Sequence, residues 1–356
     1  MISPRNAIQK MRPYSPPTGL RHGKLRLDFN ENTVGCAPEI LIGLSKALDQ
    51  NWLATYPDYT EIQPKLASFF GVKEDQVNLT NGTDEAIQLV INTYVDPGDE
   101  VIVLDPTYAM YRFYAEIAGA EVREIGYRDV PGDSEFERVL SVSFEGITEV
   151  ISDRTKVIFL PNPNNPTGSI LTLSEIKKIL LSRPNICVVV DEAYFDFWGI
   201  SALPLIAQFT NLVVLRTFSK AHGLAGLRVG CILSTGENIA NIQKGQSPYS
   251  VNCLATAAVS LAIDASKATQ EFAKQAVLGR KLLETALAQN RFTYWRSEAN
   301  FVLFDAGEVA DLLLERCKEA GILIRDRRHD LPRALRVTAG TPNQVEQFTD
   351  ILERIR

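Results

Sequence analysis

The sequence predicts an α/β protein with a large domain built on a mainly parallel, doubly wound sheet, and a smaller α+β domain. Three observations support this fold class. Apolar, β-branched runs alternate with amphipathic stretches up to about residue 250. Polar or glycine-rich loops follow several of those runs. Beyond about residue 250 the pattern changes to long helices and short alternating strands, which is typical of a second domain.

The length also favours two domains, because 356 residues exceed the size at which a single hydrophobic core usually stops growing. We expect an N-terminal arm over 1–30 that packs with the small domain, a large domain over 31–250, and a small C-terminal α+β domain over 251–356. The sequence has no internal repeat, no low-complexity stretch and no linker long enough to separate the domains freely.

The predicted elements begin after an arm, 1–24, that lacks periodicity and is expected to be extended. Pro38 can start a helix that runs to residue 48, and Gly71 can end another over 60–70. The stretch 51–58 between them is expected to be a loop. Strands of the large sheet are predicted over 77–80, 101–104, 121–125, 155–160, 186–190, 212–215 and 227–233. Helices are predicted from the turn at Gly82 to residue 95, after Tyr108, and over 173–181.

The second domain is predicted because the pattern of apolar and polar residues changes after Tyr249. Its long helices are expected over about 252–265 and 267–290, and its strands over 292–295, 301–304, 322–325 and 335–338. A final helix is expected over 342–355.

The composition excludes several classes of partner. The chain is 45% hydrophobic and 22% charged, with 43 acidic and 37 basic residues and a net charge of -6. It has no basic field for nucleic acid or anionic lipid, so neither partner is expected. The five cysteines are scattered without metal or redox spacing, and we expect them to be reduced. The start lacks the apolar core of a signal peptide and no run approaches 18 apolar residues, so a cytoplasmic location is expected.

Lys220 follows the apolar run 212–215, with Ser219 beside it and Arg228 eight residues later. A lone lysine is usually a solvated surface residue. A lysine held in a polar site between apolar strands can have its pKa lowered enough to attack a carbonyl, so Schiff-base chemistry is the first hypothesis. Pyridoxal 5'-phosphate needs such an amine for its aldehyde. It also needs a cationic cup for its phosphate, which Ser219 and Arg228 would partly supply.

A glycine turn, 81–85, leads a short strand into a helix. Free backbone N–H groups and the positive end of the helix dipole can form an anion site there. The alternative is that Thr83 or Asp84 merely caps the helix. The sequence contains neither G-x-G-x-x-G nor G-x-x-x-x-G-K-[ST], so nicotinamide and P-loop nucleotide sites lose their usual support.

Polar residues follow other predicted strands. Asp191 ends a run of five apolar residues, and without a histidine or second carboxylate cluster around it we expect no metal. The proline-rich loop 161–168 can hold the amide of Asn165 in place, and Tyr108 could stack on a flat ring or pack in the core. The loops at these residues, at Gly82 and at Lys220 fall at or near carboxyl ends of strands, where doubly wound sheets bind ligands.

Four motifs in order resemble the class II aminotransferases of fold type I, and most closely the histidinol-phosphate aminotransferase family. They are Asn-Pro-Asn-Asn-Pro-Thr-Gly (162–168), Asp-Glu-Ala-Tyr (191–194), Ser-Lys (219–220) and Arg228. The likeness covers nearly the whole chain through further segments at 13–14, 30–32, 56–57, 82–85, 106–108, 248–252, 321–326 and 335–337. One departure lies near the substrate mouth, where 32–36 read Asn-Thr-Val-Gly-Cys and the family commonly has Asn-Pro-x-Gly-Pro.

The resemblance implies roles for individual residues. Lys220 would form the Schiff base with pyridoxal 5'-phosphate and carry the substrate proton, and Asp191 would pair with the pyridine nitrogen. Asn165 and Tyr194 would hydrogen-bond the phenolic oxygen of the cofactor. Its other contacts are implied for Gly82, Thr83, Asp84, Tyr108, Ser219, Arg228 and, from the other subunit, Tyr56. Substrate contacts are implied for Tyr14, Asn30, Tyr56, Arg325 and Arg336.

The implied reaction converts L-histidinol phosphate and 2-oxoglutarate to imidazole acetol phosphate and L-glutamate, in histidine biosynthesis, on a homodimer with shared sites. An aromatic amino-acid aminotransferase and a phospho-amino-acid decarboxylase of the same fold are the alternatives. From the residues alone, Tyr14 and Tyr56 could belong to turns, and Arg325 and Arg336 to the charged surface. A ligand-sensing regulator would need a DNA-binding domain, and no basic helix-turn-helix segment precedes the arm.

Overall fold

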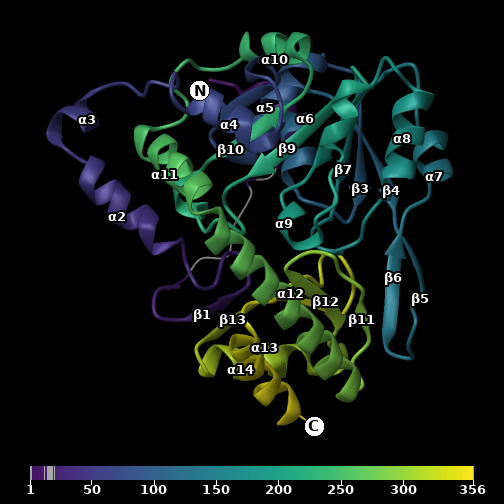
Figure 1. Ribbon diagram of the computed structural model, residues 1–356. Coiled ribbons are helices and arrows are strands. Elements are labelled where there is room, and N and C mark those ends of the chain that lie inside the picture. Colours follow the sequence, from purple (N-terminus) through teal and green to yellow (C-terminus); the bar gives the residue numbers. More distant parts are fainter. Residues whose placement is uncertain (1, 12, 14–18, 20, 356) are drawn as a thin grey trace.

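The computed structural model describes residues 2–11, 13, 19 and 21–355. These residues form two seven-stranded sheets. Figure 1 shows one sheet in the upper part of the molecule and the other in the lower part, with the long helix α12 (Ser266–Gln289) reaching down into the lower part.

The upper sheet is mainly parallel, which confirms the predicted fold class. Its spatial order is β2 (Val77–Thr80), β10 (Gly230–Leu233), β9 (Leu212–Thr217), β8 (Cys187–Asp191), β7 (Thr155–Pro161), β3 (Glu100–Asp105) and β4 (Glu121–Gly126). The last five strands run parallel, and β10 is antiparallel to both of its neighbours.

Helices cover both faces of this sheet, so its strands carry apolar side chains on both sides. Val188 and Val190 of β8 belong to one core and Val189 to the other. The first core includes side chains of α2 (Pro38–Ala47), α4 (Ile62–Phe70), α7 (Phe144–Glu149), α8 (Leu173–Ser182) and α11 (Cys253–Asp264). The second includes side chains of α5 (Gly82–Tyr94), α6 (Met110–Ala118) and α10 (Gly236–Gln243).

The lower sheet is mixed. Its order is β1 (Leu25–Leu27), β13 (Ile322–Asp326), β14 (Ala334–Thr338), β12 (Phe301–Asp305), β11 (Tyr294–Trp295), β6 (Glu137–Ser141) and β5 (Arg128–Pro131). Its core takes side chains from α12, α13 (Ala310–Glu319) and α14 (Pro342–Glu353). Short helices also lie at α9 (Phe195–Trp198), η1 (Glu74–Gln76), η2 (Leu203–Ala207), η3 (Ala225–Leu227) and η4 (Gly307–Val309).

Three stretches depart from the simple pattern of the sequence. The hairpin β5–β6 leaves the upper part and pairs with β11 in the lower sheet. The arm contains α1 (Asn6–Lys10), which contacts α6, whereas β1 pairs with β13. The helix α11 packs with α2 and α4 in the upper part. The boundaries at residues 30 and 250 stay a prediction.

Two local expectations were wrong for identifiable reasons. The stretch after Asp49 holds α3 (Gln50–Ala54) instead of a loop, because the Asp49 carboxylate accepts a hydrogen bond from the Trp52 N–H at 2.6 Å. The strand predicted from residue 227 begins at Gly230, since Arg228 has a left-handed backbone with φ of +53°.

Candidate active site

A cavity of about 850 Å³ lies where strand ends of the upper sheet face the lower sheet. Strand register aligns three of those ends, because Asp191 of β8 pairs with Pro161 of β7 and Leu215 of β9. Most of the predicted site residues line this cavity: Asn30, Thr83, Asp84, Tyr108, Asn165, Asp191, Tyr194, Ser219, Lys220, Arg228, Arg325 and Arg336.

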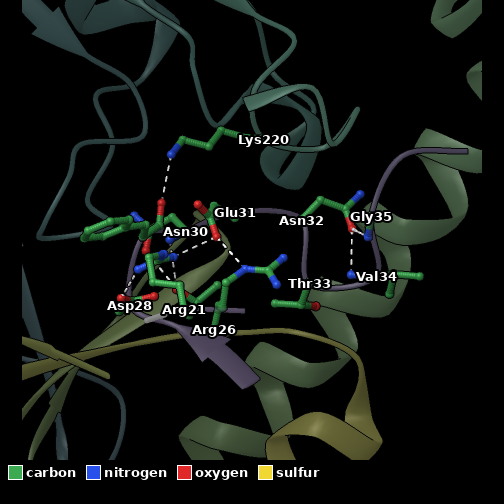
Figure 2. Close-up of polar contacts among 12 residues, drawn as sticks. Arg21, Arg26, Asp28, Asn30, Glu31, Asn32, Thr33, Val34, Gly35 and Lys220 are labelled. Carbon is green, nitrogen blue, oxygen red and sulfur yellow. Dashed lines mark hydrogen bonds and ion pairs between the residues drawn. The ribbon is translucent and has the colours of Figure 1, made fainter. Parts of the chain in front are cut away.

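Lys220 reaches into the cavity from the loop after β9. Its Nζ donates to the Phe29 carbonyl oxygen at 3.0 Å and lies 5.8 Å from the centre of the Tyr194 ring. Figure 2 shows this side chain pointing at the segment that follows β1. The same segment is tied to the lysine loop by Asn32, whose Nδ2 donates to the Ala221 carbonyl at 2.9 Å. The backbone next to β1 therefore helps to orient the amine.

Asp191 is the buried acid of the site. Its Oδ2 accepts from the Tyr111 hydroxyl at 2.7 Å, and its Oδ1 accepts from the Ala193 N–H at 3.0 Å. Burial raises the pKa of Asp191 to about 6, although the hydrogen bond from Tyr111 acts in the opposite direction. The carboxylate is thus held in one orientation and is ready to pair with a buried cation.

Two amide side chains, of Asn30 and Asn165, line the cavity. Asn30 Nδ2 donates to the Tyr194 hydroxyl oxygen at 2.9 Å. Because Tyr194 accepts this bond, its own proton remains to be donated. Asn165 Oδ1 accepts a short hydrogen bond from Arg336, which leaves the Asn165 Nδ2 group as a donor. Both donors can serve an anionic oxygen between them.

The first turn of α5 lines another side of the cavity through Thr83 and Asp84. The N-cap residue, Asn81, makes no side-chain cap hydrogen bond, and neither Thr83 nor Asp84 takes that position. The carboxylate of Asp84 instead accepts from the Tyr108 hydroxyl at 2.7 Å and from Arg228 at 3.0 Å. Gly82 lies behind this arrangement, since a Cβ there would sit 2.7 Å from Arg228 Nη2.

The opposite side of the cavity is rich in arginine. Arg336 is buried, and its Nη2 donates to the Asp28 carbonyl at 2.6 Å. Burial lowers the pKa of Arg336 to about 9, and the nearby Arg327 and Arg325 add to the effect. Its Nε has no hydrogen-bond partner among the described residues.

Among the described residues, Tyr56 is a predicted site residue that is not brought to the cavity in this chain. Tyr56 stacks on Tyr249, with ring centres 4.6 Å apart, in a separate surface hollow. Tyr14 lies outside the described residues. The segment 32–36 differs from the common family motif. Within it, the Thr33 hydroxyl donates to Gln344 at 2.5 Å, so this segment also contacts the lower part of the molecule.

Sequence reasoning missed several residues that the structure brings to the site. Among them are Glu31, Tyr111, Arg327, His329 and Asp330. Glu31 accepts from Arg21 and Arg26 at 2.8 and 2.9 Å, as drawn in Figure 2. Tyr111 lies three residues after Tyr108, just inside α6, and the two rings make an edge contact with centres 5.8 Å apart, so its closeness to Tyr108 in the sequence was the available signal. No local pattern marks the others as site residues.

Comparisons with known proteins find relatives over nearly the whole chain. The family model of aminotransferase class I and II matches residues 22–352. A histidinol-phosphate aminotransferase of Symbiobacterium thermophilum is 34% identical over 371 residues, which cover 99% of this chain and 98% of that protein. Another, of a Geobacillus species, is 31% identical over 367 residues and covers 99% and 97%.

A solved structure gives the same fold. The histidinol-phosphate aminotransferase of Sinorhizobium meliloti, in complex with pyridoxal-5'-phosphate, has a TM-score of 0.85 at 23% identity. The match covers 98% of this chain and 96% of that one. The architecture is that of a fold type I enzyme.

This architecture, with a lysine and a buried carboxylate at neighbouring strand ends, defines a pyridoxal-phosphate-dependent enzyme. The chain belongs to the class I and II aminotransferases, whose family model matches most of its length. It is an aminotransferase, and its cofactor is pyridoxal 5'-phosphate.

The residues present fit this cofactor. Lys220 supplies the amine, and Asp191 is a buried carboxylate for a protonated ring nitrogen. Tyr194 and Asn165 keep donors for a phenolic oxygen. The uncapped turn of α5, beside Ser219 and Arg228, suits a phosphate.

Among the described residues, no helix has the length and apolarity that crossing a bilayer requires.

Proposed function

We propose that this aminotransferase transfers the amino group of L-histidinol phosphate to 2-oxoglutarate, giving imidazole acetol phosphate and L-glutamate. The supporting observation is the cluster of guanidinium groups, including Arg325 and Arg336, in the cavity that Lys220 enters. The same site must accept a phosphate monoester in one half-reaction and a dicarboxylate in the other. Planar guanidinium donors can bind two oxygens of either anion.

In this proposal Lys220 would hold the aldehyde of the cofactor through Nζ, and the same amine would move the proton of the substrate carbon. Pyridoxal 5'-phosphate, when bound, supplies the aldehyde that takes up the amino group and a ring that accepts the electron pair of that carbon. Asp191 keeps the ring nitrogen protonated, and Tyr111 and the Ala193 N–H orient the carboxylate.

The remaining cofactor contacts are assigned to the residues that surround it. Asn165 and Tyr194 donate to the phenolic oxygen, and Tyr108 lies against the ring. The backbone of Thr83 and Asp84 would bind the phosphate together with Ser219 and Arg228, and the missing side chain of Gly82 makes room for the Arg228 guanidinium.

The substrate contacts are assigned to Arg336, Arg325 and Asn30, with Tyr14 as a further ligand. The geometry around Arg336 supports its role, because a buried guanidinium with an unpaired Nε gains most from an anion. Asn30 is held by Thr338, whose hydroxyl accepts from the Asn30 N–H at 3.0 Å.

A homodimer with shared sites is part of the proposal. Figure 1 shows α2 and α3 projecting from the upper part of the molecule. They and the flanking segments expose large apolar side chains, including Val34, Leu41, Ile42 and Leu53. Such a patch favours a protein partner. Tyr56, exposed next to it, would reach the phosphate of the partner's site.

Mixing two inactive variants tests the shared site. Tyr56→Ala and Lys220→Ala chains, refolded together, should regain part of the activity because a heterodimer holds one intact site. Absence of recovery in material shown to contain heterodimers would mean that each chain builds its own site.

A cytoplasmic location is also proposed, supported by five cysteines that are all free thiols in the structure. Fractionation of cells that produce the protein, with activity assayed in each fraction, tests it. Activity confined to a membrane or secreted fraction would contradict it.

A substrate panel tests the function itself. Purified protein is offered L-histidinol phosphate, L-phenylalanine, L-tyrosine and O-phospho-L-threonine, with and without 2-oxoglutarate, and glutamate and carbon dioxide are measured. We expect histidinol phosphate to be the preferred amino donor. Ready turnover of phenylalanine without histidinol phosphate would identify an aromatic aminotransferase, and acceptor-independent carbon dioxide release a decarboxylase.

A further inference from the structure

The turn between β13 and β14 brings further ionisable side chains to the arginine-rich side of the cavity. Arg327, His329 and Asp330 of this turn line the cavity beside Arg325 and Arg336. The turn joins two strands of the lower sheet, whereas Lys220 follows β9 of the upper sheet, so the two come to the cavity from different parts of the molecule.

Backbone hydrogen bonds hold this turn in one shape. The Arg327 N–H donates to the Ala334 carbonyl at 3.1 Å, which continues the pairing of the two strands. The N–H groups of Asp330 and Leu331 donate back to the Arg327 carbonyl at 2.9 and 3.1 Å. A closed turn of this kind fixes where its side chains begin.

Asp330 braces the guanidinium of Arg327. The two side chains form an ion pair through Arg327 Nε and Asp330 Oδ2, and they are only 12% and 16% exposed. His329 Nε2 lies 3.5 Å from the same carboxylate oxygen. An ion pair shielded from solvent in this way limits where the Arg327 guanidinium can lie on the cavity wall.

The charges at this end of the cavity do not balance within the described residues. Three guanidinium groups, of Arg325, Arg327 and Arg336, line the cavity here together with the carboxylate of Asp330. The carboxylate of Glu31 also lines the cavity, and it is engaged by Arg21 and Arg26. The nearby Asp28 carboxylate is engaged by Arg21. A carboxylate substrate offers two oxygens, whereas a phosphate monoester offers three terminal oxygens and up to two negative charges. The phosphate therefore matches a third guanidinium better.

We propose that Arg327, positioned by Asp330, is a specificity-determining residue that binds the phosphate monoester of the amino donor. This inference rests on the proposed function and extends it, because Arg336 and Arg325 serve both substrates while Arg327 serves the phosphorylated one. Removing Arg327 should lower the preference for a phosphorylated donor and leave the chemistry at Lys220 intact.

The test compares Arg327→Gln with Arg328→Gln as a matched control. Arg328 is on the same turn, but its guanidinium pairs with Asp326 and Asp311 at 2.7 and 2.9 Å, outside the cavity lining. Single-turnover kinetics are measured with L-histidinol phosphate and with L-histidinol, which differ only in the phosphate.

We expect Arg327→Gln to lower the rate constant over the dissociation constant for histidinol phosphate by roughly 10- to 150-fold, the worth of one charge-assisted contact. The values for histidinol and for 2-oxoglutarate should change less than about twofold, and Arg328→Gln should change none of them. Equal losses for histidinol phosphate and histidinol, or no loss for either, would overturn the assignment.

Asp330→Asn and a binding probe separate this inference from the proposed function. Asp330→Asn keeps the charge of Arg327 but weakens its brace, so it should raise the dissociation constant of histidinol phosphate while leaving turnover of histidinol unchanged. The affinity for phenyl phosphate, measured by calorimetry, should fall in Arg327→Gln and stay constant in Arg328→Gln. If histidinol phosphate is not a substrate but phenyl phosphate still depends on Arg327, the proposed function fails and this assignment stands.

Discussion

The two ends of the cavity are built in different ways. At the cofactor end, the polar residues follow neighbouring strands of one sheet, and strand register aligns their positions, as in the pairing of Asp191 with Pro161 and Leu215. At the substrate end, Arg325 and Arg336 come from the lower sheet, and Asn30 comes from the segment after β1. Positions at the first end follow from local pairing, whereas positions at the second depend on how two separate sheets meet.

The two ends also differ in the sign of the charge that burial destabilises, which is negative at the cofactor end and positive at the substrate end. Burial raises the pKa of the Asp191 carboxyl to about 6 and lowers the pKa of the Arg336 guanidinium to about 9. Each group is therefore stabilised by a ligand of opposite charge. The cofactor end should select a cation, the protonated ring, and the substrate end an anion.

The largest expected effect is at Lys220. Lys220→Ala removes both the amine that holds the cofactor and the group that moves the substrate proton, so activity should fall by more than about 10⁴-fold. The purified protein should be yellow, and borohydride should fix the label on Lys220. Lys244→Ala, which removes an exposed lysine at the end of α10 that does not line the cavity, should keep full activity. A label on another lysine would disprove the central assignment.

A smaller effect is expected for Asp191→Asn, about 10²- to 10⁴-fold in turnover, because an amide cannot keep the ring nitrogen protonated. Cofactor binding should also depend on pH. Above about pH 6 the Asp191 carboxyl is charged and can accept a hydrogen bond from a protonated ring nitrogen, and below that pH the carboxyl is itself protonated. The dissociation constant of the cofactor should therefore rise as pH falls through about 6 in the wild type.

Titrations of the cofactor-free protein with pyridoxal 5'-phosphate between pH 5 and 8 measure this directly. Asp191→Asn should bind more weakly at high pH and should lack the wild-type inflection. An inflection of the same size in the variant would assign it to another group.

The sequence predicts the cofactor end of the site better than the substrate end. The motif at 162–168, Asp191 and Lys220 each follow an apolar run, so strand prediction alone brings them to one edge of a sheet. Arg327 and Asp330 were missed because their approach to the cavity depends on a turn in the other sheet. The hairpin β5–β6 was missed for a related reason, since its partner β11 lies more than a hundred residues away.

Arg336→Ala tests the substrate end, and its expected effect is smaller than those at Lys220 and Asp191. Loss of a charge-assisted contact costs about 1.5–3 kcal/mol, roughly 10- to 150-fold in binding. Both half-reactions should weaken, with L-histidinol phosphate and with 2-oxoglutarate, while the cofactor spectrum stays unchanged. Arg316→Ala on the exposed face of α13 should alter neither. Single-turnover kinetics with each substrate test whether Arg336 binds both. A loss confined to one substrate would show that the two anions bind to different residues.

The smallest effect is expected for Tyr111→Phe, which leaves both ends of the cavity in place and removes one hydroxyl. This hydroxyl donates to Asp191 at 2.7 Å and lowers the pKa of that carboxyl. A hydrogen bond to a charged group is worth about 1.5–3 kcal/mol, and a change of one pKa unit corresponds to about 1.4 kcal/mol. The pH inflection for cofactor binding should therefore move upward by about one to two units, with little change in affinity at pH 8.5 and above.

The matched control is Tyr94→Phe, because the Tyr94 hydroxyl is buried without a hydrogen-bond partner among the described residues. Tyr94→Phe removes the same hydroxyl oxygen as Tyr111→Phe, and it should leave the pH inflection for cofactor binding in place. If Tyr111→Phe only lowered the melting temperature and left the inflection unmoved, Tyr111 would be a packing residue of α6. If the inflection moved in Tyr111→Phe alone, the protonation of the buried acid would depend on this residue, which the sequence places three positions after Tyr108.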